Sequence, residues 1–245
     1  MKSWTRTLNI DDAHSLLACA EHGLTYAEWK SAAKSLVEHL SVDRQRELFR
    51  ILRDQFLTWN EDGTVDDGLF MRFYNGSPAT AQIDLLDHQW ALSHEISLIA
   101  LRELIGPALE SNKPQIALAD LDALVARHID SRSSESLRKT RTVLLGALEG
   151  TGTLTTRGTG QHRSLRAARG RPHPAVFAYL VQLDLQGRGA EDMMASEAVE
   201  SSLGVQASLC TTDWAGHCVS WAIDRGLLAA RDDTVGLPRL RLREA

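Results

Sequence analysis

Residues 132–171 hold the side chains best suited to binding an anion. Nine of these forty residues are Arg or Lys, and only Glu135 and Glu149 oppose them, so the segment carries a formal charge of +7. The 131 residues before it contain 12 basic and 20 acidic residues, and the 74 after it contain 6 basic and 10 acidic residues. Because a solvated surface ordinarily mixes the two signs, this segregation indicates either an anion site or an exposed arginine-rich loop that has no ligand.

The first part of this segment predicts a helix from about residue 135 to residue 149. The serines that precede it offer N-caps: Ser131, Ser133 and Ser134. Leucines fall on one face at helical spacing: Leu137, Leu144 and Leu148, with Leu145 beside them. This face is expected to pack against the core.

The opposite, polar face of the predicted helix suits contacts in the major groove of DNA. Arg138, Lys139 and Thr142 lie on this face, and Arg141 lies on its flank. An arginine bound to guanine O6 and N7 is the commonest specific base contact in protein–DNA complexes. These four residues are therefore the candidates for reading a groove.

A basic, glycine-rich hairpin is predicted after Gly150, in the run TGTLTTRGTGQHRSLRAARGRP. Its arginines suit phosphate contacts, which supply affinity without sequence preference. They are Arg157, Arg163, Arg166, Arg169 and Arg171. A helix of about 15 residues, a Gly-x-Leu step and a basic hairpin form the outline of a winged helix, whose helix enters the major groove and whose wing lies along phosphates or the minor groove.

Other ligands also fit the basic segment. Glu135 and Glu149 lie on the polar face of the predicted helix and would be mildly unfavourable beside phosphate. An acidic protein partner would use the same cations, and RNA would present the same phosphates. Double-stranded DNA is the ligand that the winged-helix outline favours.

Residue types that carry catalysis or bind metals are not brought together by their spacing. His88 and His94 are six residues apart on one predicted helix, so they face nearly opposite ways. Cys210, His217 and Cys218 cluster in sequence, but neighbouring side chains on a helix diverge. The sequence has no HExxH motif, CxxC pair, phosphate-binding loop or GxSxG elbow. We therefore expect no enzymatic activity, no metal and no cofactor.

Tryptophan is frequent in this chain, which contains six. Most occupy apolar positions of predicted helices: Trp29, Trp59, Trp90, Trp214 and Trp221. We expect them to pack in the core rather than to stack on bases.

The bulk properties are those of an ordinary globular protein. Of its 245 residues, 43% are hydrophobic and 24% are charged, and the net charge is −5. The three cysteines form no paired framework, which fits a reducing compartment. The first twelve residues lack the apolar core of a signal peptide, and no apolar run approaches the roughly 20 residues that span a bilayer. The expectation is a cytoplasmic protein without a membrane partner.

The predicted fold is mainly α. Residues 1–131 read as a helical bundle centred on one long apolar helix that ends at Gly106-Pro107. Residues 132–172 read as a winged-helix-like helix with its basic wing. Residues 173–245 read as a C-terminal helical unit that ends in a β-hairpin. The order helix, Gly, Leu, hairpin thus occurs twice and predicts up to two tandem winged-helix-like units.

The capped helix and its flanks resemble the BrxA-like family of BREX phage-defence accessory proteins. The resemblance covers roughly residues 14–160. It rests on a serine-rich cap, a K-x-R pair, leucines and a Gly-Leu ending, found at Ser133, Ser134, Lys139, Arg141, Leu144, Leu145, Leu148, Gly152 and Leu154. The resemblance implies a non-enzymatic, mainly helical, DNA-binding component of a bacterial antiviral defence system that works beside other defence proteins.

Overall fold

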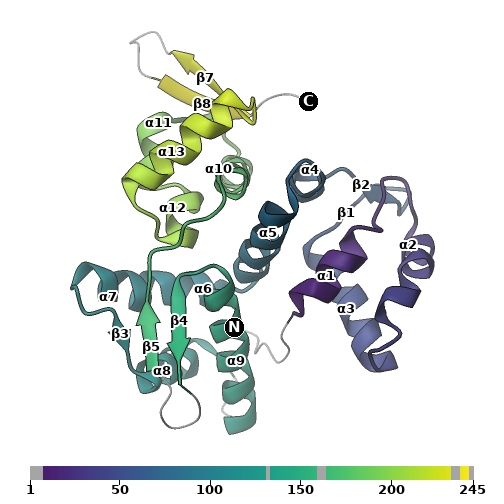
Figure 1. Cartoon of the computed structure of the whole chain (residues 1–245), viewed down its shortest axis with the longest axis horizontal. Coiled ribbons are helices and arrows are strands. Elements are labelled where there is room, and N and C mark those ends of the chain that lie inside the picture. The colour runs from purple at the N-terminus through teal and green to yellow at the C-terminus, as the bar shows by residue number, and fades with distance from the viewer. Residues whose placement is uncertain (1–7, 131–132, 159–163, 233–237, 243–245) are drawn as a thin grey trace. The chain divides into compact units, whose positions relative to one another are not determined.

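The structure, a computed structural model, describes residues 8–130, 133–158, 164–232 and 238–242 (Figure 1). It divides into two compact units, an N-terminal unit of residues 8–93 and a C-terminal unit from residue 94 onward. Both are mainly helical and contain small antiparallel sheets, so the predicted fold class is confirmed at this level. None of the described helices is long and apolar enough to span a bilayer.

The N-terminal unit consists of helices, and backbone hydrogen bonds join two of the loops that connect them. The Gly23 N–H donates to the carbonyl of Val65 at 2.9 Å, and the Val65 N–H donates to the carbonyl of Leu24 at 2.8 Å. In the core, the buried Trp29 ring packs edge-on against Phe49. The elements are α1 (Ile10–Leu17), α2 (Tyr26–Ala32), η1 (Lys34–Val37), α3 (Val42–Gln55), β1 (Thr58–Trp59), β2 (Val65–Asp66), α4 (Leu69–Asn75) and α5 (Ala79–Leu92).

The C-terminal unit contains the basic segment. Its first part comprises α6 (Glu95–Ala100), η2 (Leu101–Ile105), α7 (Gly106–Glu110), β3 (Gln115–Ile116), α8 (Leu118–His128), α9 (Ser134–Gly150), β4 (Leu154–Arg157) and β5 (Ser164–Ala167). Its second part comprises α10 (Pro174–Arg188), β6 (Asp192–Met194), α11 (Ala195–Glu200), α12 (Leu203–Ser208), α13 (Thr212–Asp224), β7 (Leu228–Asp232) and β8 (Pro238–Leu242).

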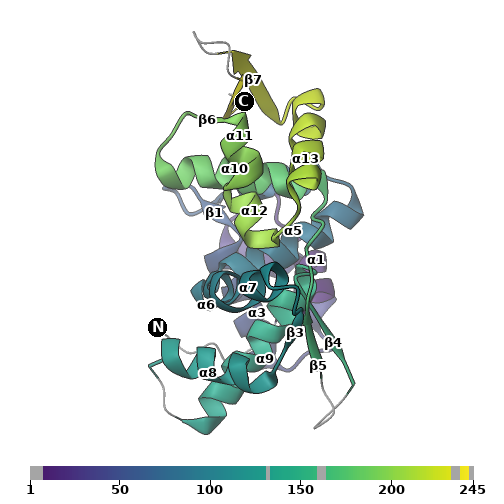
Figure 2. The ribbon, with the colours of Figure 1, turned by 90° about the vertical axis from the view of Figure 1, so that its left-hand side faces the viewer.

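These two parts repeat one order of elements, and we call them the first repeat (residues 94–167) and the second repeat (residues 174–242). Each runs from a helical stretch to a short strand, then through shorter helices to a longer helix and a closing hairpin (Figure 2). The strand orders are β3-β5-β4 and β6-β8-β7, so the last strand lies centrally in both sheets. In both sheets the neighbouring strands are antiparallel.

The longer helix ends in the same way in both repeats. Gly152 and Gly226 have φ of 69° and 66°, in the left-handed region that glycine adopts without strain. The next N–H then reaches back to the helix, from Thr153 to the carbonyl of Leu148 and from Leu227 to the carbonyl of Ala222. The predicted order helix, Gly, Leu, hairpin is therefore present twice, and each hairpin starts from a buried leucine, Leu154 or Leu228.

One core joins the elements of the first repeat. Apolar side chains from α6, η2, β3, α8, α9 and the β4–β5 hairpin pack together. They include Ile96, Leu101, Ile116, Leu121, Leu124, Leu144, Leu148, Leu154 and Leu165. Because the helices of residues 95–128 share this core with α9, they lie in the same unit as the basic segment. The sequence had placed a domain boundary after residue 131, whereas the compact units meet between residues 93 and 94.

The long helix predicted to end at Gly106-Pro107 is wrong in two respects. The backbone of His94 is extended, with φ −119° and ψ 100°, so α5 and α6 are separate helices assigned to different units. Gly106 and Pro107 do not end the helical stretch. The wider π-helical turn η2 precedes them, and α7 follows it directly. Pro107 then lies in the first turn of α7.

Short strands were also missed. No strand was expected before residue 131, yet β1, β2 and β3 each contain two residues. Residues 173–245 were expected to be helical up to the closing hairpin, but β6 lies earlier in this unit and pairs with β8. Two or three residues are too few to display the alternation that identifies a strand in sequence.

Gly170 tests how closely the backbone of the connection after β5 packs against residues of both repeats. Its N–H donates to the carbonyl of Ser208 at 2.8 Å, and a Cβ added at Gly170 would lie 2.6 Å from that oxygen and 3.1 Å from the carbonyl of Thr151. Both neighbours are backbone atoms. We expect Gly170→Ala to lower the free energy of unfolding in urea by about 1–3 kcal/mol.

The matched control is Gly187→Ala. Gly187 lies in the last turn of α10, and an added Cβ would meet nothing within 4 Å. This change should raise the free energy of unfolding by up to about 1 kcal/mol through better helix propensity. Equal stability of the two variants would contradict the close backbone packing at Gly170.

Candidate nucleic-acid interface

Helix α9 lies with its predicted apolar face in the core of the first repeat. Leu144, Leu145 and Leu148 are buried, and Leu137 packs against them while partly exposed. The carbonyl of Ser133 accepts the first helical hydrogen bond, from the N–H of Leu137. The sequence prediction of this helix and of its buried face is therefore confirmed.

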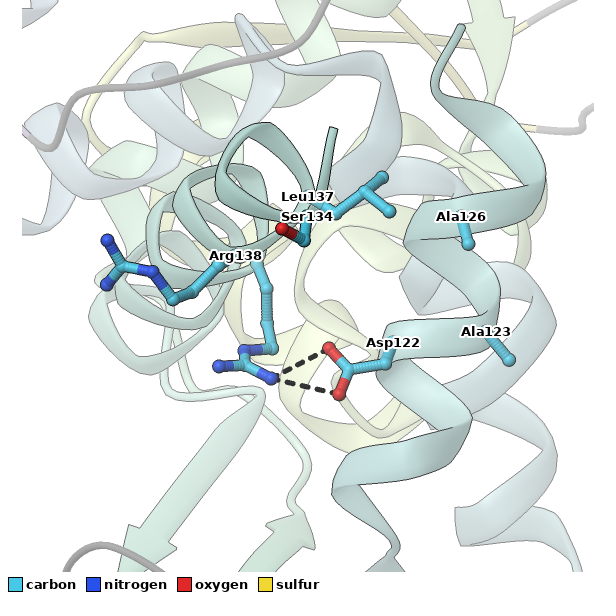
Figure 3. Close-up of a pocket in the computed structure, with 7 residues that line it drawn as sticks. Asp122, Ala123, Ala126, Ser134, Leu137 and Arg138 are labelled. Carbon is cyan, nitrogen blue, oxygen red and sulfur yellow. Dashed lines mark hydrogen bonds and ion pairs between the residues drawn. The ribbon is translucent and has the colours of Figure 1, made fainter. Parts of the chain in front are cut away.

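The flank of α9 is tied to α8 by an ion pair. The Nη1 atom of Arg141 donates to both carboxylate oxygens of Asp122, at 2.8 and 2.9 Å (Figure 3). The Arg141 side chain is 24% exposed, so this pair is partly shielded from water. Arg141 is thus neutralised within the protein, and its main contribution is to hold α8 against α9.

Lys139 is also paired. Its Nζ atom lies 2.6 Å from Oε1 of Glu135, one turn earlier on the same helix. The hydrogen bond from Lys139 lowers the pKa of the Glu135 carboxyl, so that the negative charge persists beside the lysine. The pair is exposed and contributes little net positive charge to this face.

Arg138 differs from these two cations. It is exposed, and no hydrogen bond or ion pair joins its guanidinium to another residue in the part of the chain that the structure describes. Figure 3 shows its side chain extending away from Asp122. Thr142, one turn further, is exposed, and its hydroxyl donates to the carbonyl of Arg138 at 3.0 Å. Arg138 is therefore the cation of α9 that is available to a ligand.

An open hollow of about 510 Å³ lies between α8 and α9. It is lined by Asp122, Ala123, Ala126, Ser134, Leu137, Arg138 and Arg141. Since Asp122 and Arg141 neutralise each other, the net charge of this lining is that of Arg138. The hollow can admit a small part of an anionic ligand.

The β4–β5 hairpin presents two further arginines on one face. Strand pairing sets Thr155 opposite Arg166 and Arg157 opposite Ser164. Because alternate residues of a strand point to opposite faces, Arg157 and Arg166 share the exposed face of the sheet. Neither guanidinium makes an ion pair or a hydrogen bond with another described residue; only the backbone carbonyls of the two arginines accept hydrogen bonds from side chains, those of Ser164 and Thr155. Figure 1 shows the hairpin beside α9, which contacts β4.

The other three hairpin candidates are not at comparable positions. Arg163 lies outside the described residues. Arg169 and Arg171 lie beyond the end of β5, in the connection to the second repeat, so their placement in the wing is corrected. Arg169 donates to the carbonyl of Leu209 at 3.4 Å, and the Arg171 guanidinium lies 5.9 Å from the centre of the Trp214 ring.

The equivalent helix of the second repeat has a different surface. α13 carries no lysine or arginine, and Asp213 and Asp224 are exposed on it. Trp29 and Trp90 are buried in the N-terminal unit as predicted, whereas Trp214 and Trp221 of α13 are only partly buried. The local sequence pattern does not predict this partial exposure, because both tryptophans fall at the apolar spacing of the helix.

The residues that invited a search for metal or nucleophilic chemistry do not converge. Cys210 and Cys218 are buried and His217 is exposed. Burial raises the pKa of the Cys210 thiol, so little reactive thiolate forms at neutral pH. Among the described residues, no three His, Cys, Asp or Glu side chains are grouped so that they could hold a metal ion.

The chain matches no protein-family model, no curated protein and no solved structure with which it was compared.

The Arg141–Asp122 pair can be tested by a double-mutant cycle. Both carboxylate oxygens of Asp122 accept from Nη1 of Arg141, and the pair is partly shielded from water. We therefore expect Arg141→Ala to lower the free energy of unfolding by about 1 kcal/mol, with most of this loss absent in the Asp122→Ala background. The exposed Lys139–Glu135 pair serves as the control and should show weaker coupling. Additive effects of Arg141→Ala and Asp122→Ala would contradict a stabilising link between α8 and α9.

Proposed function

We propose that this protein is a non-enzymatic, DNA-binding accessory component of a bacterial anti-phage defence system of the BREX type. The observation that carries the proposal is a set of exposed arginines, on one helix and its adjoining hairpin, whose guanidinium groups pair with none of the described residues. These are Arg138, Arg157 and Arg166. Exposed guanidinium groups without internal partners are the groups from which phosphate contacts are built.

The order of elements supports a winged-helix interpretation of both repeats. A helix, a strand, further helices and a hairpin follow each other, with the last strand in the middle of the sheet. In such a module the helix before the hairpin enters the major groove and the wing lies along the backbone. In the first repeat these parts are α9 and β4–β5.

The internal ion pairs define the role of each cation in this proposal. Arg138, with Thr142 one turn away, would meet base edges or phosphates in the groove, and Arg157 and Arg166 would meet phosphates beside it. Arg141 would act indirectly, by fixing α9 on α8 through Asp122. Changing Arg138, Lys139 and Arg141 together would therefore mix a loss of binding with a loss of stability.

The assignment to a defence system rests on the resemblance of the capped helix to the BrxA-like family. In this context the protein would act beside other defence proteins on double-stranded DNA, in the cytoplasm. Its large excess of acidic residues outside residues 132–171 fits a protein that meets DNA over a limited part of its surface.

A protein-interaction adaptor is the second candidate. The observation that favours it is the small number of unpaired cations, since Arg141 and Lys139 are already neutralised. Three guanidinium groups can hold a short acidic segment of another protein as well as they can hold phosphates. This adaptor would show no measurable duplex binding at physiological salt and would co-purify with its partner.

Duplex binding at two salt concentrations tests the proposal. The affinity for a blunt duplex should fall steeply between about 50 and about 200 mM salt, because each phosphate contact releases counterions. The variant Arg157→Ala/Arg166→Ala should bind more weakly and should lower the slope of log K against log salt by about 2. Fluorescence anisotropy of a labelled duplex measures both.

The matched control is Arg46→Ala/Arg50→Ala in α3 of the N-terminal unit. It changes the net charge by the same amount, but Arg46 and Arg50 lie near Asp43 and Asp54, at 3.6 and 4.0 Å. The control should leave the salt slope unchanged. If both double variants lower the slope equally, the hairpin is not the phosphate-binding surface.

A further inference from the structure

One flank of α13 carries a row of aromatic and cationic side chains. Trp214, Trp221 and Arg225 are spaced by seven and four residues, which places them along one line of the helix. Both tryptophans are partly exposed and Arg225 is exposed. His217, one turn after Trp214, lies beside this line and is also exposed.

Each tryptophan ring contacts a cationic or imidazole side chain, and Trp214 also contacts the connection between the repeats. The guanidinium of Arg225 lies 5.1 Å from the centre of the Trp221 ring, and that of Arg171 lies 5.9 Å from the centre of the Trp214 ring. The imidazole of His217 lies 5.1 Å from the Trp214 ring, tilted by 32°. The indole N–H of Trp214 donates to the carbonyl of Pro172 at 3.1 Å, which fixes the ring in place. The result is a pre-ordered set of flat, cationic surfaces.

The row continues the basic surface of the first repeat. From Arg166 on the hairpin, the chain passes through Arg169 to Arg171, and all three arginines are exposed. The connection between β5 and α10 contains no helix or strand in the described chain, so these cations follow one another along an extended path. A bound strand that leaves the hairpin would meet them in sequence before it reached Trp214.

Charge and shape select the occupant. Along this path the cations are Arg166, Arg169, Arg171 and Arg225, and the nearby acids of α13 are Asp213 and Asp224. These six residues sum to a formal charge of +2, and the tryptophans add stacking planes to that charge. Single-stranded nucleic acid needs this combination, because its unstacked bases lie on aromatic rings and guanidinium planes while its phosphates meet cations. A duplex keeps its bases stacked internally and cannot use the rings.

We propose that the second repeat holds a site for single-stranded nucleic acid on the Trp214–Trp221–Arg225 flank of α13, reached along Arg166, Arg169 and Arg171. This inference deepens the proposed DNA-binding function and rests on it. The first repeat would hold a duplex, and the second would hold a single strand that extends from it. The preferred ligand is then a duplex with a single-stranded extension rather than a blunt duplex.

The test compares a blunt duplex with the same duplex carrying an oligo(dT) overhang of about eight nucleotides. Since base stacking contributes about 1–3 kcal/mol per base and 1.4 kcal/mol is tenfold in affinity, the wild-type protein should bind the overhang duplex at least about tenfold more tightly. The overhang should also quench tryptophan fluorescence. Equal affinity for the two duplexes would overturn the inference.

Variants of opposite sign sharpen this comparison. Arg171→Ala/Arg225→Ala removes two exposed cations and should abolish the preference for the overhang while keeping the affinity for the blunt duplex. Asp213→Asn/Asp224→Asn removes the two opposing charges and should increase the preference. Trp214→Phe/Trp221→Phe should remove the quenching. A preference that none of these variants changes would place the single strand elsewhere and overturn the inference.

The outcomes separate the two proposals. If blunt and overhang duplexes both fail to bind and free oligo(dT) fails as well, DNA binding and the single-strand site are both wrong. If oligo(dT) binds and responds to Arg171→Ala/Arg225→Ala while the blunt duplex does not bind, the single-strand site stands and the duplex-binding proposal falls. If only the blunt duplex binds, the reverse holds, and the stacked row merely locks the connection between the repeats.

Discussion

The burial of one face of α9 is the constraint on which the first repeat depends. Leu144, Leu145 and Leu148 lie in the same core as residues of α6, α8 and both strands of the hairpin. This packing fixes the rotation of α9 about its own axis and leaves Arg138 and Thr142 facing solvent. It also sets where the helix must end, because Leu154 has to enter the same core directly after the left-handed Gly152.

Charge pairing then decides which basic residues remain available. The formal +7 of residues 132–171 overstates the charge offered to a ligand by one. It already subtracts Glu135, which pairs with Lys139, but not Asp122, which lies outside the segment and neutralises Arg141. Among the described residues of the segment, the arginines without an ion pair are Arg138 on α9, Arg157 and Arg166 on the hairpin, and Arg169 and Arg171 in the connection to the second repeat. The sequence predicted a basic helix with a supporting wing. In the structure, the hairpin is basic and the helix beside it is nearly neutral.

The two repeats share an order of elements but present different chemistry. In the first repeat, α9 and its hairpin present the exposed arginines Arg138, Arg157 and Arg166. In the second repeat, the helix before the hairpin carries partly exposed tryptophans whose rings lie near Arg171 and Arg225. Related scaffolds can hold different ligands because their cores fix the helices while their exposed positions vary freely. The proposal of a duplex site and a single-strand site follows from this difference.

The sequence alone determined the mainly helical class, the leucine face of α9 and the repeated order of helix, Gly, Leu and hairpin. These depend on local spacing and on glycine's access to positive φ, which a linear pattern displays. It did not reveal the break at His94, the two-residue strands, the pairing of Arg141 with Asp122 nineteen residues earlier, or the partial exposure of Trp214 and Trp221. Only the tertiary structure decided these features, because they depend on which helices pack together. Residues that are far apart in sequence, and that no local pattern links, become partners only when the helices pack together.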